Sequence, residues 1–348
     1  MHLTHIVIAS VVDTALLAVA ILATLLSVAL ILALSPWLKA YALARPNARS
    51  SHREPTPQGG GAAVIVATLA AAWLGVALLG MTAPGPHGEF LALTIAALAL
   101  AATGAIDDIR PLSVGLRIAL QCAAVALVLA FVPAEWRVAP ALPWWLERAG
   151  LLLGGVWFVN LTNFMDGIDW MTVAETVPIT GAVILMGLLG VVPALPLTVA
   201  VALFGAIIGF APFNKPVARL FLGDVGSLPI GLLLAWLLLH VAVGGHLVAA
   251  FLLPLYYLAD TALTLARRAR AHEPIWQAHR SHYYQRATDR GFTVGGIVLR
   301  VFLTNIALGA LALITVVWPH GGVSAAALAI GIALVGILLA SLARGKKI

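Results

Sequence analysis

Long apolar segments follow one another along the whole chain, and they constrain its fold more than any other feature. Each is close to the length that a helix needs to cross a bilayer, roughly 20 residues. We place them at about 13–36, 60–80, 89–106, 114–132, 149–164, 173–192, 195–212, 227–243, 246–266, 295–317 and 322–343. The runs are too long and too unbroken for barrel strands. The sequence therefore predicts an all-α integral membrane protein of about eleven transmembrane helices, with ten as the alternative count.

The composition agrees with this prediction. Of the 348 residues, 62% are hydrophobic and 10% are charged, whereas a soluble domain carries about 25% charged residues. The spans and their short loops use nearly the whole length, so we expect residues 1–348 to form a single polytopic domain. The first apolar run is too long, and lacks the basic start, for a cleaved signal peptide. Cys122 is the single cysteine, which excludes a disulfide framework and a Cys-rich metal site.

The distribution of Lys and Arg predicts the orientation in the membrane. Eleven spans put the two ends of the chain on opposite sides and divide the loops into two sets. One set holds 18 of the 20 Lys and Arg residues, and only Arg137 and Arg148 fall in the other. The positive-inside rule then puts the N-terminus outside and the C-terminus in the cytoplasm. The cytoplasmic loops are expected at about 37–60, 107–113, 164–172, 213–226 and 267–294.

One polar stretch, NLTNFMDGIDW, interrupts the apolar runs. Its amides and carboxylates, Asn160, Asn163, Asp166 and Asp169, follow one another at steps of three residues. On a helix or helical turn these steps place the side chains along one side, drifting slowly round it. Such a group can hold a hard cation or a polar ligand. The alternative is a helix N-terminus with Asn and Asp as caps, which accounts for one or two of the four.

Further acids lie at the expected cytoplasmic ends of other spans. Asp107 and Asp108 are adjacent, and they repel each other unless a cation or a basic partner neutralises them; an interfacial stop signal is the alternative. Asp224, in the stretch FLGDVGS, is a turn residue by default and becomes a candidate metal ligand if it faces the other acids. Asp260 is an isolated acid inside the ninth span, where its depth favours a function, but the sequence indicates no partner.

Basic residues gather in two of the cytoplasmic loops. In the first loop, Arg49 and His52 supply anion-binding groups, and the Pro and Gly content argues against regular structure. In the last loop, the residues that stand out are His279, Arg280, His282 and Arg286. We interpret these four as a cationic cluster, because His is a poor lipid anchor at neutral pH. Arg267 and Arg268 are assigned to contacts with anionic lipid.

Together these groups indicate a class of chemistry. Oxygen donors without cysteine suit Mg²⁺, with Mn²⁺ as the alternative. A hard cation beside Arg and His is typical of phosphoryl transfer, and an apolar groove in the bilayer suggests a lipid substrate. The alternative from another class is a secondary transporter with intramembrane acidic ion sites. Two features count against it, because the acids gather at one face and the halves of the chain show no repeat.

Four motifs, taken together, resemble those of a known family. They are Asp107-Asp108, the NxxNxxDGID run from Asn160, FLGDVGS from Phe221, and HxxHxxxR from His279 to Arg286. SHREPTPQGG, which starts at Ser51, is similar to that family's first cytoplasmic motif. Over about residues 45–295 the chain resembles the polyprenyl-phosphate N-acetylhexosaminyl-1-phosphate transferases, the WecA- and MraY-like membrane enzymes of glycosyltransferase family 4.

The resemblance implies transfer of a sugar-1-phosphate, expected to be N-acetylhexosamine-1-phosphate, from a UDP-sugar to undecaprenyl phosphate with release of UMP. It implies a Mg²⁺-dependent enzyme of the bacterial inner membrane, with its site facing the cytoplasm. The HxxH form favours the branch that primes O-antigen, and hence lipopolysaccharide, or other surface glycans. No nucleic-acid partner is expected, membrane lipid surrounds the chain, and a homodimer is compatible with it.

Residues and resemblance together assign roles to individual side chains. We expect catalytic roles for Asp107, Asp108, Asp166, His279, His282 and Arg286. We expect substrate binding by Asn160, Asn163, Asp169, Phe221, Arg280, Arg49 and His52, with Phe221 near the uracil. We expect metal binding by Asp224 and Asn163.

The sequence departs from the family pattern after the DGID run. Trp170 and Met171 stand where the family commonly has Gly. A bulky ring next to Asp169 is expected to reshape the sugar pocket, which leaves the identity of the donor open. For the reaction itself we favour direct in-line attack by the lipid phosphate, oriented by Asp107 or Asp108, over a covalent aspartyl intermediate.

Overall fold

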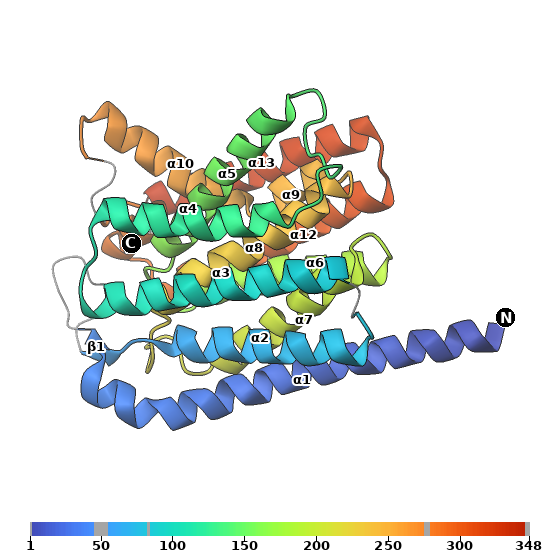
Figure 1. Cartoon of the computed structure of the whole chain (residues 1–348). Coiled ribbons are helices and arrows are strands. Elements are labelled where there is room, and N and C mark those ends of the chain that lie inside the picture. The colour runs from blue at the N-terminus through green and yellow to red at the C-terminus, as the bar shows by residue number, and fades with distance from the viewer. Residues whose placement is uncertain (1, 45–54, 82–83, 275–278, 345–348) are drawn as a thin grey trace.

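The computed structural model describes residues 2–44, 55–81, 84–274 and 279–344, and it is a bundle of helices (Figure 1). The helices are α1 (His2–Tyr41), α2 (Gly60–Leu78), α3 (Pro84–Ile109), α4 (Val114–Ala130), α5 (Trp144–Met165), α6 (Met171–Leu188), α7 (Ala194–Phe210), α8 (Asp224–Val243), α9 (Leu247–Leu252), α10 (Leu255–Arg270), α11 (Tyr283–Asp289), α12 (Val294–Val317) and α13 (Gly321–Arg344). Two short strands, β1 (Leu43–Ala44) and β2 (Thr56–Pro57), form an antiparallel pair.

Every apolar segment expected from the sequence contains helix, and the ninth contains two. That segment is divided at Pro254 into α9 and α10, because proline lacks an N–H and its ring clashes with the preceding turn. Seven helices of the described chain are long and apolar enough to cross a membrane, and α4 and α7 are shorter apolar helices. The protein is therefore an all-helical, multi-pass membrane protein with about seven to nine apolar helices.

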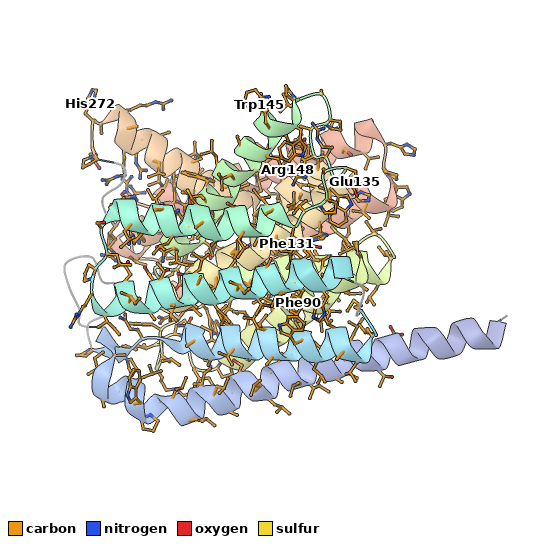
Figure 2. All side chains as sticks on the ribbon, viewed as in Figure 1. Phe90, Phe131, Glu135, Trp145, Arg148 and His272 are labelled. Atoms are coloured by element: carbon orange, nitrogen blue, oxygen red, sulfur yellow. The ribbon has the colours of Figure 1, made fainter. Side chains whose placement is uncertain are left out.

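The loops at the two ends of the bundle belong to different parts of the sequence. His272, just after α10, lies at one end, while Glu135, before α5, and Trp145, in the first turn of α5, lie at the other (Figure 2). In the described part of the chain, α1 starts at one end of the bundle and α13 finishes at the opposite end (Figure 1). An odd number of crossings produces this arrangement of chain ends.

Helix α8 occupies the centre of the bundle and is buried along nearly its whole length. It packs against α2, α3, α5 and α6. Large apolar side chains such as Leu17, Leu303 and Ile337, on α1, α12 and α13, lie on the outside. Bilayer lipid would cover such surfaces in a membrane protein. The N-terminus of α8 is consequently fixed by the helices around it.

The first loop contains more regular structure than expected. Residues Thr56–Pro57 pair with Leu43–Ala44, so the prediction that this loop lacks regular structure was wrong at its second half. A short two-stranded pair tolerates Pro57 because the N–H that proline lacks is needed only by a neighbouring strand. Arg49 and His52 lie outside the described residues.

The chain that follows β2 runs beside the stretch that precedes α8. The N–H of Phe221 donates to the carbonyl of Pro57 at 2.8 Å, and the N–H of Gly60 donates to the carbonyl of Phe221 at 2.9 Å. A Cβ on Gly61 would lie 2.2 Å from the Cα of Gly226, so only glycine allows this approach of two backbones. The start of α2 thereby holds the start of α8 in place.

Candidate active site

A polar cavity of about 240 Å³ opens where α3 and α5 end and α8 begins. Its wall contains residues from five separate stretches of the chain. Six of them are site residues predicted from the sequence: Asp108, Asn163, Asp166, Asp169, Phe221 and Asp224. The fold thus brings together acids that lie more than one hundred residues apart in the sequence.

Asp224 is the first residue of α8 rather than a residue of an isolated turn. An acid in the first turn of a helix interacts favourably with the helix dipole. The amide Nδ2 of Asn163 donates to Asp224 Oδ1 at 2.7 Å and to Ser227 Oγ at 2.9 Å. Gly223 precedes the helix at φ 76°, a conformation that favours glycine, and a Cβ there would lie 2.7 Å from Asp108 Oδ2. The position of Asp224 is therefore set from both sides.

The adjacent aspartates at the end of α3 have different surroundings. The carboxylate of Asp108 accepts hydrogen bonds from the backbone N–H groups of Asp224 and Val225, at 3.2 and 3.3 Å, and faces the cavity. Asp107 accepts from Arg117 Nη1 at 2.7 Å and from the N–H of Leu112 at 2.6 Å. Asp107 is absent from the cavity wall, and its charge is balanced by Arg117 instead.

The turn between α5 and α6 carries two more acids. Asp169 Oδ2 accepts from the N–H of Ala218 at 2.9 Å, and Asp166 Oδ1 accepts from the hydroxyl of Thr172. Burial raises the pKa of Asp166 to about 8, and the nearby carboxylates of Asp224 and Asp108 add to the shift. Carboxylates crowded in this way cannot all be charged unless a cation or a basic group joins them.

Asn160 does not reach the cavity. It exchanges two hydrogen bonds with the amide of Gln121 on α4, at 2.6 and 3.3 Å. The reason is geometric, because each step of three residues on an α-helix turns the side chain by about 60° from the previous direction. Asn160 therefore faces a different helix from Asn163 and Asp166.

Trp170 also lies outside the polar cavity. Its backbone has φ 63°, its N–H donates to Asn214 Oδ1 at 2.8 Å, and its ring Nε1 donates to the carbonyl of Ala211 at 2.6 Å. The ring lines a separate apolar cavity of about 270 Å³ between α6, α7 and α12. The ring turns toward the end of α7 and does not line the polar cavity, so its effect on the sugar pocket stays a prediction.

The HxxHxxxR residues lie at and before α11, and none of the four lines the polar cavity. His282 is buried, with Nδ1 at 3.2 Å from Asp260 Oδ1, and the ring of His279 stacks on it at 4.9 Å. Arg280 contacts Thr288 and Asp289 at 2.9 and 3.2 Å. The partner that the sequence did not indicate for Asp260 is thus His282.

His279 differs from the cationic residue expected. Burial, followed by the neighbouring His282 and Arg268, lowers the pKa of His279 to about 4. At neutral pH, before any phosphate binds, this imidazole is uncharged and can act only through hydrogen bonds.

Arg267 and Arg268 have protein partners, contrary to their assignment to lipid alone. Arg267 donates to the carbonyl of Ser281 and lies 5.3 Å from the ring centre of Tyr283. Arg268 pairs with Glu273 at 2.7 Å. These side chains therefore connect the end of α10 to Glu273 and Ser281.

Sequence reasoning missed three amides in the cavity wall: Gln58, Asn214 and Gln285. Gln58 Nε2 donates to the backbone carbonyl of Asp108 at 3.3 Å, and Asn214 Nδ2 donates to the carbonyl of Leu220 at 2.9 Å. Uncharged amides in polar loops do not stand out by composition. Nearness to a motif was the available signal: Gln58 precedes the Gly-rich stretch, Asn214 precedes FLGDVGS, and Gln285 lies within HxxHxxxR.

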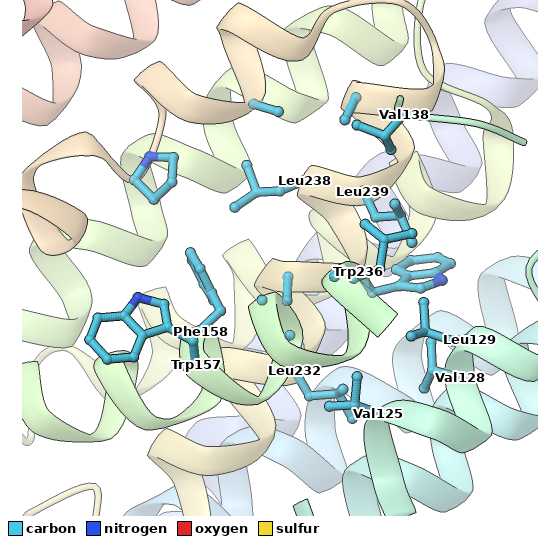
Figure 3. A pocket seen from close by; sticks show the side chains of 18 of the residues that line it. Val125, Val128, Leu129, Val138, Trp157, Phe158, Leu232, Trp236, Leu238 and Leu239 are labelled. Atoms are coloured by element: carbon cyan, nitrogen blue, oxygen red, sulfur yellow. The ribbon is translucent and has the colours of Figure 1, made fainter. Parts of the chain in front are cut away.

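A second, apolar cavity of about 360 Å³ lies along the same helices, α5 and α8, and is completed by α4, α9 and α10 (Figure 3). Trp157, Phe158 and Trp236 contribute rings to its wall. Phe158 precedes Asn163 by five residues, which corresponds to about 7.5 Å along a helix. The apolar cavity therefore lies close to the polar one.

Comparison with known proteins agrees with this geometry. The sequence profile of glycosyl transferase family 4 matches residues 90–242, which include all the acidic motifs. The chain is 29% identical to the decaprenyl-phosphate N-acetylglucosaminephosphotransferase of Mycobacterium tuberculosis H37Rv, over 75% of this chain and 72% of the relative. It is 25% identical to a probable undecaprenyl-phosphate N-acetylglucosaminyl 1-phosphate transferase of Bacillus subtilis, over 81% of each. A phospho-N-acetylmuramoyl-pentapeptide-transferase of Pseudarthrobacter chlorophenolicus is 30% identical over 54% of this chain and 66% of the relative.

The chain belongs to glycosyl transferase family 4, the WecA- and MraY-like membrane enzymes, which confirms the resemblance drawn from the motifs. It is an enzyme of the polyprenyl-phosphate sugar-1-phosphate transferase family. The secondary-transporter alternative is set aside by this membership.

Proposed function

We propose that the protein transfers N-acetylhexosamine-1-phosphate from a UDP-sugar to undecaprenyl phosphate and releases UMP. The observation that carries the proposal is the pairing of an acidic cavity with an apolar cavity on the same two helices, α5 and α8. The polar cavity suits the phosphates and the nucleotide, and the apolar one suits a polyprenyl chain. The names of the relatives from Mycobacterium and Bacillus, which specify N-acetylglucosamine and a polyprenyl phosphate, support the same pair of substrates.

The donor set fits Mg²⁺, which enzymes of this family typically use. In the described residues no three His, Cys, Asp or Glu side chains converge into a site of their own. Mg²⁺ commonly takes only one or two carboxylates, with waters and substrate phosphates completing the shell. Asp224, with Asn163 beside it, would hold the ion, and the cation would offset the repulsion among the carboxylates of Asp108, Asp166 and Asp224 in the cavity wall. Bound Mg²⁺, or Mn²⁺, would supply charge neutralisation for the diphosphate and for departing UMP.

The protein's own residues would position the reactants. A lipid phosphate monoester carries about −1.5 to −2 charges at pH 7, so its oxygen needs little help from a base. This oxygen forms a bond to the phosphorus that bears the sugar. The bond between that phosphorus and the bridging oxygen breaks, and the bridging oxygen leaves as part of UMP. Asp108, fixed by the start of α8, would orient the lipid phosphate, and Phe221 would stack near the uracil. His279 and Arg286 would bind phosphate oxygens, joined by Arg49 and His52, and His282 would accept a hydrogen bond from a protonated phosphate oxygen.

Further parts of the proposal concern the cell. We place the protein in the bacterial cytoplasmic membrane with the polar cavity on the cytoplasmic side, and we take eleven crossings as its topology. The bacterial relatives and the distribution of Lys and Arg support this placement. The product would be the first lipid-linked intermediate of a surface polysaccharide such as O-antigen.

The test is release of UMP by purified protein supplied with undecaprenyl phosphate and a panel of UDP-N-acetylhexosamines, titrated with Mg²⁺. Asp224→Asn keeps the size of the side chain and removes its charge, so it should weaken metal binding and lower turnover by a factor of about 100 or more. Asp13→Asn, an exposed acid on α1, is the matched control and should keep the wild-type rate. Wild-type turnover and metal dependence in Asp224→Asn would exclude Asp224 as the metal ligand, and absence of UMP with every donor would refute the reaction.

A further inference from the structure

Asp260 on α10 is a fully buried acid to which the proposed reaction gives no role. Its carboxylate accepts five hydrogen bonds. Two come from its own helix, from the hydroxyls of Tyr256 and Thr264, both at 3.2 Å. The other three come from the start of α11: His282 Nδ1 at 3.2 Å, and the backbone N–H groups of Tyr283 at 3.0 Å and Tyr284 at 3.3 Å. A side chain of one helix thus fixes the beginning of another.

The backbone contacts explain why the acid tolerates burial. The first N–H groups of a helix have no partner within that helix and must be satisfied from outside. Tyr284 is buried, so water does not replace such a partner. Asp260 accepts these bonds as a carboxylate and is itself compensated by donors on every side.

The contact with His282 selects one form of that imidazole. A carboxylate beside Nδ1 favours the tautomer with its proton on Nδ1, which leaves Nε2 as a hydrogen-bond acceptor. His282 Nε2 is buried and has no hydrogen-bond partner among the described residues. Nε2 is therefore a buried acceptor that is left over for a ligand.

Helix α11 in turn lies against the turn that carries Asp166. The hydroxyl of Tyr284 donates to the carbonyl of Phe164 at 2.9 Å, and Gln285 lines the polar cavity. A Cβ on Gly167 would lie 2.2 Å from Tyr284 Oη and 2.8 Å from Gln285 Nε2. A shift of α11 would consequently displace Gly167 and change the cavity wall at Gln285.

We propose that Asp260 is a positioning residue for the transfer reaction: its carboxylate anchors α11, which contacts the turn that carries Asp166, and holds His282 with the proton on Nδ1. The link to catalysis rests on the function proposed above. The anchoring itself does not, and the experiments separate the two.

The kinetic test uses Asp260→Asn, which keeps the size of the side chain. The oxygen that accepts from His282 Nδ1 also accepts from the N–H of Tyr283, so an NH₂ at that position would face both groups and favour the opposite tautomer, while the amide oxygen would still accept from the N–H of Tyr284. We expect kcat for UMP release to fall by about 100-fold while KM for the UDP-sugar stays within about threefold. Thr264→Val is the matched control, since it removes one donor to the same carboxylate and leaves the α11 contacts intact; it should keep the rate within about twofold. Asp260→Glu keeps the charge and should be at least about tenfold faster than Asp260→Asn.

A double-mutant cycle shows whether Asp260 acts through His282. If it does, the double variant with Asp260→Asn and His282→Gln should be no slower than His282→Gln alone, because the two substitutions remove the same function. Losses that multiply in the double variant would overturn the proposal.

A spectroscopic readout does not depend on turnover. Nitrogen-15 NMR of histidine-labelled protein in nanodiscs reports which ring nitrogen carries the proton, and the His282 signal is identified by its loss in His282→Gln. We expect the Nδ1–H form in the wild type and the Nε2–H form in Asp260→Asn. The same form in both proteins would overturn the proposal. If Asp260→Asn does not fold, the wild type decides alone, since a proton on Nε2 would overturn it. Failure of the UMP assay would refute the proposed reaction without changing this result.

Discussion

Asp107 and Asp108 are neighbours in the sequence, yet their carboxylates meet different partners. Asp108 caps the start of α8 and faces the polar cavity, whereas Asp107 pairs with Arg117 and accepts from the N–H of Leu112. On a helix, adjacent side chains point about 100° apart, so a doublet of acids rarely serves one ligand with both members. The contacts assign the cavity to Asp108 and a supporting role to Asp107.

This assignment predicts how pairs of substitutions combine. Asp107→Asn and Arg117→Gln remove the two halves of one ion pair, so the double variant should lower the thermal midpoint no further than the more damaging single variant. Asp108→Asn does not share that pair, and its effect should add to that of Arg117→Gln. The measurement is thermal unfolding in detergent for the five proteins and the wild type. Additive losses for Asp107 and Arg117 would contradict the pairing.

At this scale the sequence predicted part of the site. Asp108, Asn163, Asp166, Asp169, Phe221 and Asp224 were predicted, and the structure places all six in one cavity wall. Charge is scarce in an apolar chain, so acids at helix ends stand out. The orientation of Asn160 could not be predicted, because it depends on where α5 ends, and that boundary is not encoded by spacing alone.

The helical elements follow from apolar length, but the ends and breaks of the helices do not. A proline inside an apolar run is tolerated in many membrane helices, so Pro254 gave no clear indication that the ninth segment divides into α9 and α10. Helix α11 has seven residues and no long apolar run, so the sequence read it as loop. Its stability comes from Asp260 and from the Arg267 contact with Ser281, both of them tertiary.

His279, in the segment before α11, should make the stability of the protein depend on pH. The pKa of His279 is about 4 in the folded protein, against an ordinary value of 6.5. Between these values the unfolded chain binds more protons than the folded protein, so stability is present above about pH 6.5 and is lost as the pH falls toward 4. His279→Gln cannot titrate and should flatten this part of the profile.

Thermal midpoints in detergent from pH 4 to 7 would check this expectation. His320→Gln, an exposed histidine before α13, serves as the control and should keep the wild-type slope. An unchanged slope in His279→Gln would show that the protonation of His279 is the same in the folded and unfolded chains.

On the scale of the whole molecule, the two sets of loops correspond to two ends of the bundle. His272 lies at one end, and Glu135 and Trp145 lie at the other (Figure 2). The end of α10 contacts Ser281, just before α11, and α11 contacts the turn that carries Asp166, so the acids belong to the end with His272. The charge distribution assigns these ends to opposite sides of a membrane, since 18 of the 20 Lys and Arg residues fall in one set of loops. The structure shows which loops lie at the same end of the bundle, and the charge distribution predicts which end faces the cytoplasm. Neither alone gives the topology.

Cysteine labelling tests the topology directly. In a Cys122→Ser background, we expect Glu135→Cys and His320→Cys to react with an impermeant maleimide in intact cells, because both positions are exposed at the end with few basic residues. Ala271→Cys, exposed just after α10, should react only after the membrane is opened. Asp289→Cys, at the end of α11, is the second position on that side and should behave like Ala271→Cys. Labelling of Glu135→Cys and Ala271→Cys from the same side would contradict the eleven-crossing topology. It would also remove the reason for placing the polar cavity on the cytoplasmic side, where a nucleotide sugar is available.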